Sequence, residues 1–184
     1  MGKKLLVGLD GCAVAETTLP YVALFARAHR ATAVLVRVVP SSSGRSTYES
    51  GSNANQADGG LGDEPGETLE ELRAIYEAQR YLHAIGVRLG LFGVVVETVV
   101  AVGDPATVLV EEARRHQVEM VILATHGRTG IGRWIYGSVA HRVMHETDIP
   151  VLLVPPGCLR SDDVVRASQT VHEPSAISQD LATA

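Results

Sequence analysis

Short apolar segments alternate along the chain with longer segments whose apolar residues recur at helical spacing. Five apolar segments are short and bounded, as strands buried in a parallel sheet are: residues 4–9, 33–39, 94–102, 120–124 and 151–154. The segments between them predict four helices, over 16–28, 67–84, 105–116 and 138–145. This alternation predicts an α/β fold with an open five-stranded parallel sheet, right-handed crossovers and helices on both faces.

Two polar segments interrupt the pattern. Residues 40–66 are dominated by Ser, Gly, Asn and Asp, which predicts a mobile loop inserted after the second strand. The loop could cover a ligand, but a solvated insertion is the favoured interpretation because loops tolerate added length at little cost. Residues 157–184 are polar and lack periodicity, so we expect a disordered tail after one domain over 1–156.

Composition narrows the class of protein. The chain has 184 residues, of which 46% are hydrophobic and 4% aromatic, as expected for one domain of strands covered by helices. A net charge of −5 argues against a nucleic-acid surface. We expect no membrane partner and a cytoplasmic location, since no segment approaches the ~20 apolar residues of a spanning helix and Asp10 interrupts the first apolar run. Cys12 and Cys158 have no metal-ligand spacing; reduced thiols are favoured, and a disulfide stays open.

The most informative stretch follows the fourth predicted strand. Residues 125–137 form a glycine-rich basic loop, and Ser138 stands where the next helix can begin. A strand, a glycine loop and a helix N-terminus together form a phosphate-binding geometry, because backbone N–H groups and the helix dipole converge on an anion. Neither a Walker loop nor Gly-x-Gly-x-x-Gly occurs here, so neither standard nucleotide fingerprint applies.

The spacing of Gly127, nine residues and then Gly137-Ser138 resembles the universal stress protein family, whose ATP-binding members carry Gly-x-x-Gly-x9-Gly-Ser/Thr. Ala124 replaces the first glycine, which removes freedom at φ > 0 and adds a methyl group near the phosphates. Asp10 matches the acid that contacts adenosine in the family. By its own sequence context, Asp10 is a turn or N-cap residue.

Further positions carry the resemblance. Cys12 stands where the family usually has serine, and Val38 matches the residue whose backbone meets adenine. The resemblance covers Lys3 to about Pro155 and implies an adenine nucleotide alpha hydrolase-like sheet of order 3-2-1-4-5. It also implies a homodimer through the last strand, 151–154.

By the same resemblance, ATP, possibly with Mg²⁺, is the expected ligand. The implied binding residues are Gly8, Asp10, Val38, Leu123, Ala124, His126, Gly127, Arg128, Gly137, Ser138, Val139 and Ala140.

Three functions remain open at this stage. A non-enzymatic ATP-binding stress protein is favoured, with a weak ATPase and a dimeric interaction module without ATP as alternatives. No catalytic residue is expected, because phosphoryl transfer needs a base and a metal-binding acid near the γ-phosphate and the family places Asp10 at the adenosine end. His141 and His145 could share a metal at i, i+4, but surface histidines are favoured, so no metal site is expected.

Overall fold

The computed structural model describes residues 2–41, 69–125 and 137–156. Residues 42–66 of the polar segment, 126–136 of the glycine-rich loop and the tail over 157–184 therefore lie outside the described residues. The described elements are β1 (Lys4–Gly8), the 3₁₀ helix η1 (Ala15–Thr18), α1 (Leu19–His29), β2 (Thr32–Val39), α2 (Leu69–Gly90), β3 (Val96–Val102), α3 (Pro105–Arg115), β4 (Met120–Ala124), α4 (Ser138–Glu146) and β5 (Val151–Val154).

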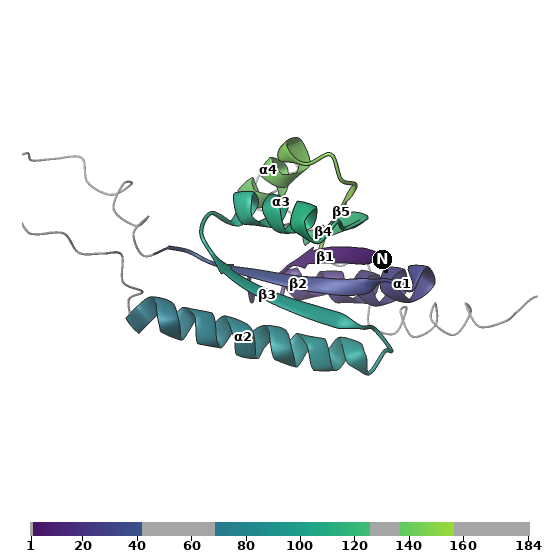
Figure 1. The fold of residues 1–184 in the computed structure, drawn as a ribbon, viewed down its shortest axis with the longest axis horizontal. Helices are drawn as coiled ribbons and strands as arrows, with labels where there is room; N and C mark the ends of the chain where they lie inside the picture. Colours follow the sequence, from purple (N-terminus) through teal and green to yellow (C-terminus); the bar gives the residue numbers. More distant parts are fainter. Residues whose placement is uncertain (1, 42–68, 126–136, 157–184) are drawn as a thin grey trace, which may run out of the picture.

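The strands form one parallel sheet in the order β3-β2-β1-β4-β5, which confirms the predicted fold class (Figure 1). The first strand lies in the centre: Leu6 pairs with Val34 of β2 on one side and with Val121 of β4 on the other. The two strand edges of the sheet belong to β3 and β5.

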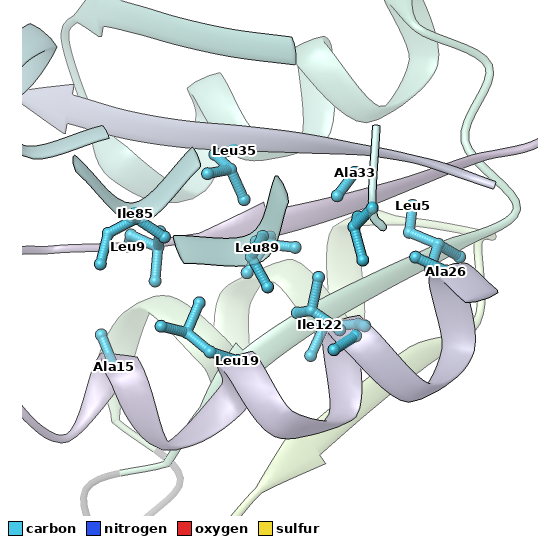
Figure 2. Packing of buried hydrophobic residues seen from close by; sticks show 14 of the residues in the cluster. Leu5, Leu9, Ala15, Leu19, Ala26, Ala33, Leu35, Ile85, Leu89 and Ile122 are labelled. Atoms are coloured by element: carbon cyan, nitrogen blue, oxygen red, sulfur yellow. The ribbon is translucent and has the colours of Figure 1, made fainter. Parts of the chain in front are cut away.

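Helices cover both faces of this sheet. Helices α1 and α2 lie on one face, and α3 and α4 on the other (Figure 1). Successive residues of a strand point to opposite faces, so Leu5 and Val7 enter the core beneath α1 and α2 while Leu6 enters the core beneath α3 and α4. Figure 2 shows the first core, where Leu19 of α1 and Leu89 of α2 gather around the strands.

Some predicted boundaries were wrong. Helix α2 extends to Gly90, six residues beyond the predicted end at Ala84. Ile85 and Leu89 are each 2% exposed, so the buried face continues and outweighs the low helix propensity of Gly86. The first predicted helix divides instead into η1 and α1, with Pro20 in the first turn of α1.

The N-cap of α3 also fixes the position of α4. Asp104 Oδ1 accepts hydrogen bonds from the Thr107 N–H at 3.1 Å and the Thr107 hydroxyl at 2.8 Å. The same oxygen accepts from Nη1 of Arg142 on α4 at 2.7 Å. The Thr107 hydroxyl and N–H, and then Arg142, hold the pKa of Asp104 below its usual value of 3.8. One exposed carboxylate therefore caps α3 and links it to α4.

Replacing Ile122 by alanine tests the first core. Ile122 is fully buried between the sheet and α1, so the cavity should lower the free energy of unfolding by roughly 2–5 kcal/mol. Val95→Ala, at a site that is 66% exposed, should cost less than about 1 kcal/mol. Urea unfolding of the three proteins measures both values, and equal losses would contradict the described packing.

The Asp104 linkage predicts a pH-dependent difference between the wild type and Asp104→Asn. The pKa of Asp104 is lower in the folded protein, so its ionised carboxylate stabilises the fold above pH 3.8 and loses this effect as pH falls through the folded value. Urea unfolding at pH 7 should show the variant to be less stable, and the gap should shrink towards pH 3. A gap that stays constant over this range would show that the carboxylate charge plays no part.

Candidate functional site

A pocket of about 270 Å³ opens at the carboxyl ends of β1, β2 and β4, beside α3 and α4. The chain leaves β1 towards the face covered by α1 and leaves β4 towards the face covered by α4. Adjacent strands that send their connections to opposite faces open a crevice between them, which is where open α/β sheets bind ligands. The topology therefore places the pocket at the usual ligand edge.

The pocket brings together nine of the twelve residues predicted from the sequence. These are Gly8, Asp10, Val38, Leu123, Ala124, Gly137, Ser138, Val139 and Ala140. The other three, His126, Gly127 and Arg128, lie outside the described residues. The structure thus places the predicted residues that it describes around one space.

Five further residues line the pocket and were not predicted: Leu9, Ala15, Val36, Pro105 and Leu109. Val36 precedes Val38 by two positions, so strand alternation alone could have indicated that both point to one face. Pro105 and Leu109 are separated by about one helical turn, but only the placement of α3 over the sheet shows that they face the site.

Gly8 leaves space for the leucine side chains that line the pocket. A Cβ atom at this position would lie 2.6 Å from Cδ2 of Leu123 and 3.3 Å from Cδ1 of Leu109. Both leucines line the pocket, so a side chain at position 8 would displace them into the space that a ligand would use. Glycine is needed here for space rather than for an unusual φ.

Asp10 opens the turn after β1. Its Oδ1 accepts a hydrogen bond from the Cys12 N–H at 2.9 Å, which closes an Asx-turn. Cys12 in turn accepts from the Ala15 N–H through Sγ at 3.4 Å, so the sulfur occupies a capping role that a serine hydroxyl would fill more strongly. Asp10 therefore holds the turn and lines the pocket at once.

The same turn is supported from the other face of the sheet. Gly11 has φ of +86°, and a Cβ there would lie 2.9 Å from Nη1 of Arg37, so glycine is required. The Arg37 guanidinium carbon lies 5.0 Å from the centre of the Tyr81 ring of α2. Burial, and then the negative charge of Glu16, raise the pKa of Tyr81 to about 12. Helix α2 thus helps to position the Asp10 turn.

Val38 presents its backbone to the pocket. The β1–β2 ladder ends where the Leu9 N–H donates to the Val36 carbonyl at 2.9 Å. Residues two apart in a strand direct their peptide groups to the same neighbour. The N–H and C=O of Val38 therefore point to the space beyond the end of β1, which the pocket occupies.

The N-terminus of α4 forms another wall. Gly137 is the N-cap residue and supplies no side-chain cap, and the His141 N–H donates to the Gly137 carbonyl. The N–H groups of Ser138, Val139 and Ala140 precede this first helical bond, so they are available as donors to an anion. Helix α4 begins at Ser138, which is the start predicted for this helix from the sequence.

Ala124 sits at the end of β4 without backbone strain. Among the described residues, the non-glycine positions with positive φ are Arg30 and Gln117, so Ala124 needs no left-handed conformation. The replaced glycine of the motif therefore costs no conformational strain at this position. Its methyl group, which lies in the pocket wall, remains as a steric difference.

The described residues contain no group of three or more His, Cys, Asp or Glu side chains that could hold a metal ion. The rings of His141 and His145 contact each other, with centroids 4.5 Å apart. In the described part of the chain, no helix is both long enough and apolar enough to cross a membrane. Asp10 is the one ionisable residue among the described residues that line the pocket.

Universal stress proteins are similar to this chain in sequence. The universal stress protein YxiE of Bacillus subtilis is 26% identical over 156 residues, which cover 84% of this chain and 99% of that protein. The universal stress protein MJ0531 of Methanocaldococcus jannaschii is 35% identical over 78 residues, and this match spans 42% of this chain and 46% of the relative.

Solved structures agree in fold. A universal stress protein in complex with cAMP aligns with a TM-score of 0.58 and 19% identity, over 84% of this chain and 97% of that chain. The universal stress protein from Archaeoglobus fulgidus in complex with dAMP aligns with a TM-score of 0.57 and 17% identity, over 83% and 97%. The model of the universal stress protein family matches residues 1–155, and the chain therefore belongs to this family.

Proposed function

We propose that this chain binds ATP in the described pocket and acts as a non-enzymatic, nucleotide-responsive stress protein in the cytoplasm. One observation carries the proposal: the pocket combines apolar walls and the exposed peptide groups of Val38 with the N-terminus of α4. An apolar base, a polar sugar and an anionic phosphate chain need these three environments. Two structures of this fold hold cAMP and dAMP, which supports an adenine nucleotide as the ligand of this pocket.

The pocket suggests a role for each group. The adenine ring would lie against Val36, Leu109 and Leu123, which supply its apolar walls. The carbonyl of Val38 would accept from the exocyclic amine of adenine, and its N–H would donate to a ring nitrogen. Asp10 would accept from a ribose hydroxyl.

The phosphates would extend towards α4. The N–H groups of Ser138 and Val139 point to this end of the pocket, where the helix dipole favours negative charge. Gly127 and Arg128 belong to the loop that the family motif assigns to the phosphates, and we propose that they complete this part of the site. Mg²⁺ would then be held by phosphate oxygens and water rather than by a cluster of protein carboxylates.

We propose binding without turnover. Phosphoryl transfer needs a base or water-positioning group and a metal-binding acid close to the γ-phosphate. Asp10, the acid of the described pocket lining, stands in the turn after β1, at the end of the pocket proposed for the ribose. ATP would therefore act as a bound signal that stabilises one state of the protein.

A homodimer through β5 completes the proposal. This strand lies at the edge of the sheet, and Val151, Leu152 and Leu153 are each only partly buried. Val154 and Pro150 direct their carbonyls to β4, so the peptide groups of Val151 and Leu153 face away from the sheet. A second copy could cover this apolar edge by strand pairing around a two-fold axis.

Gly8→Ala tests the nucleotide site. The new methyl group would push the tips of Leu123 and Leu109 into the pocket, so ATP affinity should fall about tenfold. Gly86→Ala is the matched control, because a Cβ there meets Val96 at an ordinary 3.4 Å. Calorimetric titration measures both affinities. Unchanged affinity in a folded Gly8→Ala protein would place the nucleotide elsewhere.

Leu153→Pro tests the dimer. Proline removes an N–H that faces outward and leaves the β4 pairing intact. At low micromolar concentration the wild type should sediment as a dimer and the proline variant as a monomer. Leu153→Ala, which keeps the N–H, controls for the lost side chain and should remain largely dimeric. A proline variant that stays dimeric would show that β5 is not the interface.

A further inference from the structure

Helix α2 carries exposed apolar residues opposite its buried face, towards both ends of the helix, with the exposed residues Arg80 and His83 between them. Its buried face, with Ala78, Leu82, Ile85 and Leu89, packs on the sheet. Its outer face carries Leu69 (67% exposed), Leu72 (46%), Tyr76 (61%) and Val87 (54%). At 3.6 residues per turn these four positions fall within one stripe about 60° wide, opposite the buried face. A surface helix normally presents polar residues there.

The stripe extends past the last residue of α2. The Leu91 N–H donates to the Val87 carbonyl at 3.2 Å, which continues the helical turn, and Leu91 is 83% exposed. Figure 1 shows α2 along the outside of the molecule, beneath β2 and β3 and away from α3 and α4. We call the exposed residues 69, 72, 76, 87 and 91 the α2 stripe.

We propose that the α2 stripe is an interface with a second copy of this chain, formed by two antiparallel α2 helices around a two-fold axis. The arrangement of the residues carries this inference. Three pairs of positions on α2 are arranged symmetrically about one point: Leu69 with Leu91, Leu72 with Val87, and Tyr76 with His83. The midpoint of every pair falls at Arg80 or between Gln79 and Arg80. An antiparallel copy centred there would place each residue against its counterpart, which is the condition for a self-complementary interface.

One charged pair beside the stripe, Glu70 and Arg88, is also complementary across this axis. Glu70 and Arg88 are 18 residues apart, which is about five helical turns, so they lie on the same flank of α2. Across a two-fold axis between antiparallel helices, each flank meets the same flank of the partner. Glu70 of one copy therefore meets Arg88 of the other, twice. Arg88 already binds Glu16 at 2.6 Å, but its side chain is 57% exposed and its guanidinium has further donors.

The exposed area suits a weak but specific contact. A fully exposed aliphatic side chain has roughly 100 Å² of surface, and a tyrosine side chain has ~200 Å². Multiplied by the exposed fractions of the five stripe residues, these areas give roughly 350 Å² of exposed apolar side chain per copy. Homodimer interfaces are about 65% apolar, so this corresponds to roughly 550 Å² per copy. Stable interfaces begin near ~600 Å² per partner, and weak transient contacts lie just below this value. We expect association with a dissociation constant on the order of 100 µM.

This interface is separate from the β5 edge. Helix α2 covers β2 and β3, whereas β5 is the strand at the far end of the sheet (Figure 1). Two different two-fold interfaces on one chain link dimers into larger assemblies as concentration rises. The pairing would also act on the helix that supports Arg37 and the Asp10 turn.

A disulfide at the two-fold axis tests the proposed pairing. In a full-length Cys12→Ser, Cys158→Ser background, Arg80→Cys places two thiols near each other only if the helices pair as described. Glu111→Cys, at an exposed position on α3, is the matched control. Under mild oxidation at about 100 µM, the expected dissociation constant, the Arg80→Cys protein should form covalent dimer at least tenfold faster than the Glu111→Cys protein. Equal rates would overturn the proposal.

Sedimentation in the Leu153→Pro background gives a second readout. This protein should dimerise as its concentration rises through about 100 µM, and adding Leu72→Glu with Val87→Glu should abolish the association. Val102→Glu, which adds a charge at another exposed valine, should leave it unchanged. A Leu153→Pro protein that stays monomeric at millimolar concentration, or equal effects of the stripe and control substitutions, would contradict pairing through α2.

Discussion

The central strand β1 must bury both of its faces and then end at a residue without a side chain. Leu5, Leu6 and Val7 fill the cores on the two sides of the sheet, and the fold depends on this double burial. Gly8 follows, where a Cβ atom would meet Leu123 at 2.6 Å. On the face covered by α3 and α4, the closely packed core therefore gives way to the pocket at this residue. Gly8 therefore directly follows the residues that stabilise the fold and is itself part of the candidate site.

The fold could be predicted because each parallel strand is a short apolar run between helical patterns. Boundaries were harder to predict where packing overrides propensity. Gly86 remains helical because Ile85 and Leu89 keep α2 on the sheet. The site residues came from a family motif, and the described ones gather at one pocket. Pro105 and Leu109 could not be assigned from the sequence, since only the position of α3 over the sheet brings them there.

Ala124 shows why a motif residue needs its structural context. A motif can need glycine because the backbone adopts a positive φ or because there is no room for a side chain, and the sequence does not distinguish these two reasons. In this structure Ala124 has no positive φ, so the conformational cost is absent and the added methyl group is what remains. Cys12 is similar, because its sulfur still accepts from the Ala15 N–H, although more weakly than an oxygen would.

The central claim is that the pocket recognises adenine through the peptide groups of Val38 and the phosphates through α4. Calorimetric titration of the folded wild-type chain with ATP and with GTP, each with Mg²⁺, tests it most directly. We predict micromolar affinity for ATP and at least tenfold weaker binding of GTP, because the guanine carbonyl would face the Val38 carbonyl without a proton between them. Absence of binding at millimolar ATP, or equal affinity for both nucleotides, would contradict this account.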